Sequence, residues 1–234
     1  MFRFKQFNVD QTGCAMKINT DGVLVGALAG ADQPDTILDI GTGTGVIALM
    51  LAQRFANAQI DAVEIDETAA ATAQRNFENS PFAGRLGLYA DSFEAYFDKY
   101  PARKHDLIVS NPPFYINALE SLGEKRTLAK HADERFFESL VSGTVRHLSG
   151  DGEFWLILPL QTAGLVKSIA ASVGLKLKQT INVLSYPDSA PHREILVFAF
   201  INDRKGDQTF VIYNAPKVYS QQYEEVLKPF FTIF

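Results

Sequence analysis

Residues 36–45, Thr-Ile-Leu-Asp-Ile-Gly-Thr-Gly-Thr-Gly, decide the fold of this chain. The first five residues form an apolar run of strand length, which the glycines end. The next segment, Val46–Phe55, has the length and apolar content of a helix. A strand, a glycine turn and a helix in this order predict the first crossover unit of a parallel sheet.

The same alternation continues along the chain. Further strands are expected at Gln59–Ile65, Leu86–Ala90, His105–Ser110 and Glu153–Leu158, and further helices at Glu67–Asn79, Arg135–Leu148 and Gln161–Val173. The pattern predicts an α/β fold, a mostly parallel sheet with helices on both faces. Three late strand-like runs, Leu175–Leu184, Arg193–Ile201 and Thr209–Tyr213, have no helix between them and predict an antiparallel C-terminal edge. We expect a single domain over residues 1–234, with residues 1–35 as an N-terminal extension.

The glycine loop predicts a nucleotide-cofactor site. Gly41, Gly43 and Gly45 let the backbone turn tightly and approach a ligand closely. Val46 breaks the dinucleotide pattern G-x-G-x-x-G, so a cofactor without a pyrophosphate fits better. Asp39 agrees with this, because a carboxylate would repel a pyrophosphate but can accept from an ammonium, or through water from an amino-acid moiety.

Two more acids follow successive strands. Glu64 stands 19 residues after Gly45, where a carboxylate typically binds the two ribose hydroxyls, and Asp91 is placed to accept from an adenine amino group. The alternative is a glycine turn with solvated acids nearby. Taken together, the glycines and the three acids resemble the S-adenosylmethionine site of class I methyltransferases.

The segment Ser110-Asn-Pro-Pro-Phe114 follows the strand His105–Ser110. Two prolines stiffen the strand exit, so the Asn111 side chain and the Pro112 carbonyl present two hydrogen-bond acceptors. Two fixed acceptors can draw a planar amino group toward tetrahedral geometry, which makes its lone pair available to a methyl group. Phe114 can stack on a planar substrate. The alternative is a rigid proline turn with no chemical role.

The motif is similar to the (Asn/Asp)-Pro-Pro-(aromatic) motif of amino methyltransferases, which act on adenine N6 in DNA or RNA or on glutamine N5 in proteins. Segments outside this motif resemble bacterial tRNA methyltransferases that modify N6 of adenine 37 in a valine tRNA. They are Phe4–Phe7, Cys14–Ile18, Thr20–Gly22, Leu49–Arg54, Ile60–Glu64, Asn79–Pro81, Pro191–Arg193 and Tyr219–Ser220. The glutamine methyltransferases normally carry an extra N-terminal helical domain, and the DNA methyltransferases usually carry a target-recognition domain. We expect neither of these domains in this chain.

The resemblance also supplies weaker candidates. Lys17 and Asp21 could cover the cofactor pocket, although the extension could equally well only pack on the domain. Candidate RNA contacts are Lys125, Arg126, Lys130, His131, His192 and Arg193. The first four lie in a polar run after the proline motif, for which a solvated loop is the alternative. For Arg193 the alternative is an ordinary surface arginine.

Charge and composition narrow the class of protein. The net charge is −5, but residues 31–100 hold four basic and eleven acidic side chains and the remainder is slightly basic. The acidity therefore belongs to the segment expected to bind a cationic cofactor and does not exclude an RNA partner. No metal is expected, because the four histidines lack ligand-spaced Cys or carboxylates. We expect no signal peptide, no membrane span and no obligate protein partner. We expect a cytoplasmic location.

The resemblance implies an enzyme that methylates N6 of an adenine in tRNA, with S-adenosylmethionine as cofactor. Two alternatives stay open at this point. One is a methyltransferase for protein glutamine or DNA adenine, and the other is a non-catalytic RNA-binding protein on the same fold. For the C-terminal aromatics Phe230–Phe234, a core or edge strand is expected.

Overall fold

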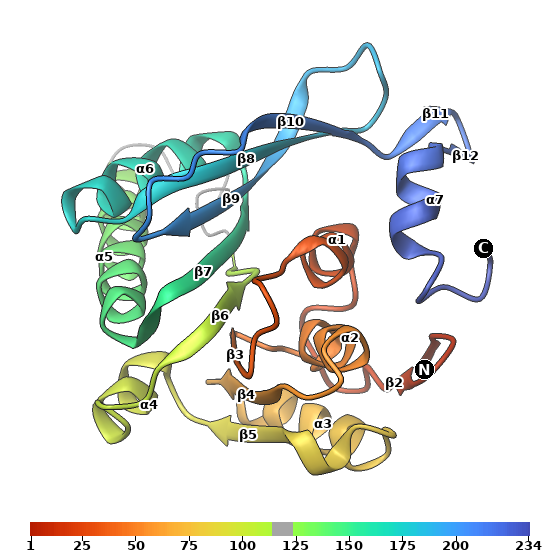
Figure 1. The fold of residues 1–234 in the computed structure, drawn as a ribbon, viewed down its shortest axis with the longest axis horizontal. Helices are drawn as coiled ribbons and strands as arrows, with labels where there is room; N and C mark the ends of the chain where they lie inside the picture. Colours follow the sequence, from red (N-terminus) through yellow and green to blue (C-terminus); the bar gives the residue numbers. More distant parts are fainter. Residues whose placement is uncertain (114–123) are drawn as a thin grey trace.

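The computed structural model describes residues 1–113 and 124–234, with an eight-stranded sheet at its centre (Figure 1). In spatial order the strands are β10 (Gly206–Val211), β8 (Lys176–Leu184), β9 (Pro191–Ala199), β7 (Leu148–Leu158), β6 (His105–Ser110), β3 (Thr36–Ile40), β4 (Gln59–Glu64) and β5 (Leu86–Ala90). The pairs from β7 to β5 are all parallel, as the alternation of strands and helices predicts. The predicted parallel half is therefore confirmed.

The late strands differ in part from the expected edge. β9 is antiparallel to both of its neighbours, β7 and β8, which confirms an antiparallel element. The outermost strand β10 instead pairs parallel with β8. Because β9 is antiparallel to β8, the chain leaves β9 near the start of β8, where the Lys205 amide donates to the Lys178 carbonyl at 2.8 Å. A strand that begins there and follows the free edge of β8 runs in the same direction as β8.

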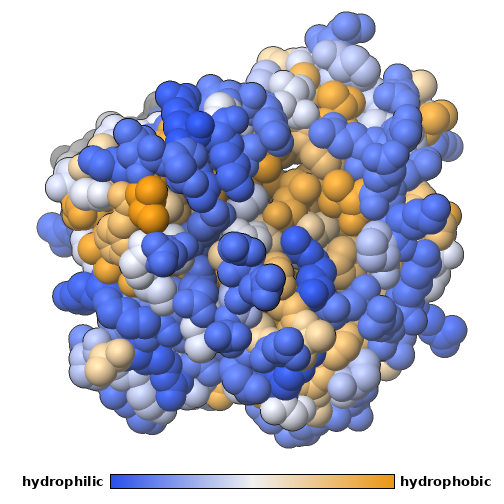
Figure 2. Space-filling model, in the orientation of Figure 1, coloured by the Kyte–Doolittle hydropathy of each residue, from blue (hydrophilic) through white to orange (hydrophobic). Residues whose placement is uncertain are grey.

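Helices cover both faces of the sheet (Figure 1). The core is divided accordingly, because the adjacent residues Ile37 and Leu38 of β3 belong to different hydrophobic clusters. The helices α1 (Thr20–Leu28), α2 (Val46–Arg54), α3 (Glu67–Glu78) and α7 (Gln221–Leu227) pack in the first cluster, and α4 (Phe93–Lys99), α5 (Glu124–His147) and α6 (Leu160–Ser172) in the second. Figure 2 shows apolar side chains gathered in the middle of the visible face, over α1 and α2, with hydrophilic ones around them.

The two ends of the chain lie side by side. The N-terminal strands β1 (Phe2–Arg3) and β2 (Asn8–Val9) form a hairpin, and β11 (Tyr213–Ala215) pairs with β12 (Val218–Tyr219) before α7. Phe4 forms an isolated bridge with Phe231, and the Lys5 ammonium donates to the Lys228 carbonyl at 2.6 Å. Phe230 and Phe231 are buried, which confirms a core role, but the expected strand is wrong. The segment 228–230 continues as a turn after α7.

Gly45 gives a test of the local packing. Its φ is +82°, and a Cβ there would overlap Cε1 of Phe77, on α3. We expect Gly45→Ala to lower the free energy of unfolding by about 2–4 kcal/mol, since strain and overlap add. The control is Gly174→Ala, with a φ of +89° but no atom within 4 Å of the Cβ position, which should cost roughly 1–2 kcal/mol. Urea unfolding measures both, and equal losses would contradict the packing assigned to Phe77.

Candidate active site

The register of the parallel strands brings the predicted residues to one edge of the sheet. Ile40 at the end of β3 is paired with Val63 of β4 and with Ser110 of β6, and Glu64 is paired with Ala90 of β5. The Ser110 hydroxyl donates to the Ile40 carbonyl at 2.8 Å, which ties two of these ends together. The glycine loop, Glu64, Asp91 and Asn111 therefore follow neighbouring strand ends, where ligands of such sheets bind.

The glycine loop combines an open part and a packed part. Gly41, Gly43 and Gly45 all have a positive φ, and the amides of Gly41 and Thr42 donate to the Val63 carbonyl at 2.9 and 3.0 Å. No atom lies within 4 Å of a Cβ placed on Gly41 or on Gly43, so a ligand can approach the backbone closely there. Gly45 instead lies against Phe77, so the packing of α3 by itself explains the glycine at that position.

Asp39 is fully buried beneath the loop. Its Oδ2 accepts from the Thr42 hydroxyl at 2.6 Å and from the Ala48 amide at 3.2 Å. Among the described residues, no group donates to its Oδ1. Burial raises the pKa of Asp39 to about 7, although the bonds from Thr42 and Ala48 oppose the shift. Asp39 thus holds the glycine loop to the start of α2 through Oδ2, while its Oδ1 has no hydrogen-bond donor among the described residues.

Glu64 holds the loop from the next strand. Its Oε2 accepts from the Gly43 amide at 2.8 Å, and its Oε1 accepts from the Asp66 amide at 2.9 Å. Each carboxylate oxygen has a further lone pair, so this half-buried side chain can still accept from two hydroxyls. Asp91 is exposed after β5, and its Oδ1 accepts from the Ser92 amide at 2.9 Å.

The proline motif lies directly after β6. Asn111 is half-buried and Pro112 is buried, whereas Phe114 is outside the described residues. The first turn of α1 packs against Asn111, because a Cβ on Gly22 would lie 3.6 Å from Asn111 Nδ2 and 3.4 Å from Asn19 Oδ1. The N-terminal segment therefore reaches the predicted chemical centre, which the sequence did not reveal.

Two of the weaker candidates, Asp21 and Arg193, are far apart in sequence but form an ion pair. Asp21 on α1 accepts through Oδ2 from Arg193 Nε at 2.8 Å, at the start of β9. β9 runs antiparallel to β7, so its start shares the edge where β7 ends. The neighbouring His192 is half-buried, and burial together with the charge of Arg193 lowers the pKa of its imidazole. Asp21 is thus engaged by a candidate RNA contact, and Lys17 is exposed.

The other basic candidates belong to a helix. Lys125, Arg126, Lys130 and His131 fall within α5, which begins at Glu124, and their side chains are outside the described ones. The alternative of a solvated loop is therefore wrong for the backbone of this run. The predicted start at Arg135 is also wrong, because the preceding residues are polar and lack the apolar period that marks a helix.

Comparisons with known proteins agree with this geometry. The model of the methyltransferase small domain family matches residues 19–167. A protein of Pedobacter heparinus named tRNA1(Val) (adenine(37)-N6)-methyltransferase is 47% identical over 100% of this chain and 98% of its own length. Proteins of the same name from Flavobacterium psychrophilum (99% of each chain) and Bacteroides fragilis (98% of this chain, 97% of the relative) are 40% and 38% identical. The chain belongs to this methyltransferase family.

Solved structures show the same fold at low sequence identity. A protein of Agrobacterium tumefaciens, described as a predicted O-methyltransferase, superimposes with a TM-score of 0.66 at 16% identity, covering 90% of this chain and 96% of that one. A ribosomal protein L11 methylase of Lactobacillus delbrueckii subsp. bulgaricus gives 0.58 at 18% identity, with 82% and 83% covered. The mostly parallel sheet is thus the fold of class I methyltransferases.

The site fits the methyl donor of this family, S-adenosylmethionine. The unused, buried Oδ1 of Asp39 and the open backbone at Gly41 and Gly43 leave room and an acceptor for its amino-acid part. Glu64 presents oxygens for ribose hydroxyls. Ile65 was not a candidate, yet its side chain is 72% exposed directly after Glu64, and an apolar surface there can pack on a flat ring. Its exposure is visible only in the structure, since the sequence places it within the predicted strand Gln59–Ile65.

Two searches of the described residues concern other classes of site. They contain no group of three or more His, Cys, Asp or Glu side chains able to hold a metal ion. No helix among the described residues has both the length and the apolar content needed to cross a membrane.

The pKa of Asp39 predicts a pH dependence of stability. A folded-state pKa of about 7 against 3.8 for an unperturbed aspartate means that the folded protein binds this proton more tightly. This contribution to the free energy of unfolding is full below about pH 4 and is lost as pH rises to about 7. Asp39→Asn keeps an acceptor and does not titrate, so this loss should be absent from its profile. Urea titrations of both proteins from pH 4 to 8 measure it, and parallel profiles would contradict the shift.

Proposed function

We propose that this protein transfers a methyl group from S-adenosylmethionine to N6 of an adenine in tRNA, at position 37 of a valine tRNA. The single observation that carries the proposal is the Asn-Pro-Pro motif at the end of β6, on the same edge as the glycine loop and Glu64. The relatives that match the whole chain are named for this reaction. A cytoplasmic location is part of the proposal, because tRNA is modified there.

Asn111 and Pro112 prepare the amine. The exocyclic nitrogen of adenine is planar, and its lone pair is delocalised into the ring. When its two N–H groups donate to the Asn111 side-chain oxygen and the Pro112 carbonyl, the nitrogen becomes more tetrahedral and its lone pair turns toward the donor. When bound, S-adenosylmethionine supplies an electrophilic methyl group on a sulfonium. As the nitrogen forms its bond to the methyl carbon, the bond from that carbon to the sulfonium would break, and its electron pair would stay on sulfur as a neutral thioether. The methylated nitrogen would then carry a positive charge and release one proton to solvent.

The acidic groups hold the cofactor in this proposal. Asp39, with Gly41 and Gly43, faces its amino-acid part, Glu64 binds the ribose hydroxyls and Asp91 accepts from the adenine amino group. These roles agree with the excess of acidic side chains in residues 31–100, because a sulfonium and an ammonium are both cationic. Gly45 contributes to the turn rather than to the ligand surface.

The N-terminal extension covers the cofactor pocket. The Asp10 amide donates to the Asn76 side chain at 2.8 Å, and Asn76 Nδ2 donates to the Thr44 carbonyl in the glycine loop at 2.9 Å. The extension is thus attached to the loop at one point, and Gly22 of α1 contacts Asn111 at another. Lys17, exposed between these points, is available to the cofactor carboxylate.

RNA contacts are proposed at the same edge. The Asp21–Arg193 ion pair holds the Arg193 guanidinium against the first turn of α1, the turn that also lies next to Asn111, and there it can meet a phosphate of the substrate, with His192 next to it in sequence. Lys125, Arg126, Lys130 and His131 at the start of α5 add positive charge close to the proline motif in sequence. A loop adenine is already unpaired, so moving it into the site costs less than extracting it from a duplex.

A transfer assay with three methyl acceptors distinguishes the proposed tRNA methyltransferase from the protein or DNA methyltransferase and from the non-catalytic RNA-binding protein. Purified protein is incubated with tritium-labelled S-adenosylmethionine and total tRNA, total protein or genomic DNA. Label in N6-methyladenosine of tRNA is expected. Label in protein or DNA only would refute the substrate, and no transfer to any of them, with RNA still bound, would favour the non-catalytic alternative.

Asn111→Ala tests the chemical role. We expect transfer to tRNA to fall at least about 100-fold, since one of the two acceptors of the amine is lost. The Kd for S-adenosylmethionine, measured by calorimetry, should stay within about twofold. The matched control is Asn57→Ala, an exposed asparagine just before β4, at the opposite end of the strands, and it should leave both values unchanged. Full activity in Asn111→Ala would overturn the assignment.

A further inference from the structure

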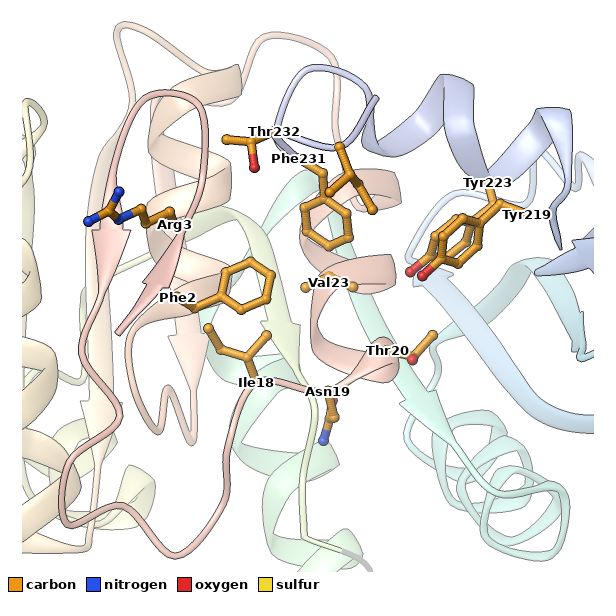
Figure 3. A pocket seen from close by; sticks show the side chains of 11 residues that line it. Phe2, Arg3, Ile18, Asn19, Thr20, Val23, Tyr219, Tyr223, Phe231 and Thr232 are labelled. Atoms are coloured by element: carbon orange, nitrogen blue, oxygen red, sulfur yellow. The ribbon is translucent and has the colours of Figure 1, made fainter. Parts of the chain in front are cut away.

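A pocket of about 350 Å³ lies between the two ends of the chain and the first turn of α1 (Figure 3). Its walls are mostly aromatic and aliphatic, with Phe2, Ile18, Val23, Tyr219, Tyr223 and Phe231 facing it. Val23, Tyr223 and Phe231 are buried and form the floor, while Arg3, Thr232 and Ile233 at the rim are exposed. An apolar floor with a polar, open rim is the usual form of a small-molecule site, and the volume falls within the range of roughly 300–1,000 Å³ for such sites.

One wall of the pocket is a stack of tyrosines. The rings of Tyr213 and Tyr219 have centroids 5.1 Å apart at 22°, and those of Tyr219 and Tyr223 are 4.8 Å apart at 11°. In Figure 3 the hydroxyls of Tyr219 and Tyr223 point into the pocket, side by side, toward the wall formed by Phe2 and Ile18. Tyr213 and Tyr223 cover the two faces of Tyr219, so this wall presents ring edges and two hydroxyls that can both donate and accept hydrogen bonds, while Phe2 and Phe231 supply the remaining aromatic surface of the pocket.

The pocket is separate from the cofactor residues but close to the chemical centre. None of the proposed cofactor residues, such as Asp39 or Glu64, lines it. Asn19, Thr20 and Val23 of the first turn of α1 line the pocket, and Gly22 of the same turn faces Asn111. One helical turn thus separates this pocket from the place where the adenine amine is bound.

We propose that this pocket binds a second nucleobase of the RNA substrate, one that lies near the target adenine in the same loop. This inference rests on the proposed function. Bases in single-stranded loops are recognised by stacking on aromatic side chains and by hydrogen bonds to their edges, and this pocket offers both. Arg3 lies at the rim with its guanidinium turned outward, placed to meet the backbone phosphates rather than the base (Figure 3).

The pocket explains how a protein without an excess of positive charge can select one loop. With a net charge of −5, non-specific attraction to phosphates is weak, so affinity must come from a few placed contacts. A base held in the aromatic pocket and an adenine held at Asn111 would fix the loop at two points. Both bases must then be at compatible positions, which is a form of sequence selection.

The test uses the full-length protein and an RNA hairpin in which 2-aminopurine replaces single loop nucleotides around the target adenine. We expect fluorescence at one of these positions to be quenched on binding, because the base packs against Phe2 and against the ring edges and hydroxyls of Tyr219 and Tyr223. In Tyr219→Leu the quenching should disappear and KM for the hairpin should rise on the order of tenfold to a hundredfold. The Kd for S-adenosylmethionine should not change. Tyr219→Phe should retain most of the quenching, and Val218→Ala, on the same strand but 53% exposed, should behave like the wild type.

A second pair of variants avoids the buried side chains. Ile233 is 66% exposed at the rim, so Ile233→Glu and Ile233→Lys should both fold normally. If RNA passes over the rim, Ile233→Glu raises KM for the hairpin and Ile233→Lys lowers it or leaves it unchanged. Equal KM values for the two variants, or quenching that survives in a folded Tyr219→Leu protein, would overturn the proposal.

The outcome is distinguishable from a failure of the proposed function. If the wild-type protein methylates the hairpin but the pocket variants have no effect, only the second base site is wrong. If the wild-type protein transfers no methyl group to tRNA at all, the proposed function itself fails, whatever the fluorescence shows.

Discussion

The parallel hydrogen-bond register of β3, β4 and β6 fixes where the functional groups of this molecule lie. Ile40 is paired on one side with Val63 and on the other with Ser110, so the glycine loop, Glu64 and Asn111 leave the sheet side by side. A slip by one residue would turn each following side chain to the opposite face. Such a slip is disfavoured because adjacent residues of β3 belong to two separate cores, as Ile37 and Leu38 do. The packing of the sheet and the geometry of the site are thus set by the same pairing.

Electrostatics divides the site into two halves with different tasks. The half near the glycine loop is acidic and contains Asp39, whose burial makes its charge costly in the absence of a cation. The half near α1 and β9 contains the Asp21–Arg193 pair, which is only partly buried and contributes little to stability by itself. In the proposed function, this pair holds a guanidinium at the edge of the sheet that meets the RNA substrate. A net charge of −5 is therefore compatible with an RNA substrate, because the excess of acid lies in the segment that forms the cofactor half.

Local patterns made the parallel half of the fold predictable. β3, β5 and β6 have the predicted bounds, since each is a short run with an apolar centre that is followed by glycine, by an acid or by Asn-Pro. α1 was not predicted, because Gly22–Gly26 are all buried and show no helical period. The parallel direction of β10 follows from the antiparallel pairing of β8 with β9, which leaves the chain near the start of β8 beside its free edge, and no local pattern encodes that pairing. Asp21 and Arg193 are 172 residues apart, and the aromatic pocket joins both chain ends, so neither could be found from local sequence.

The central claim is that the groups at these strand ends methylate N6 of a tRNA adenine. Its most direct test is nucleoside mass spectrometry of the valine tRNA from a strain that lacks this gene, compared with the parent and with the strain complemented by the wild-type gene or by the gene for Asn111→Ala. N6-methyladenosine should be lost in the deletion strain, restored by the wild-type gene and not restored by the gene for the variant. An unchanged level of N6-methyladenosine in the deletion strain would contradict it.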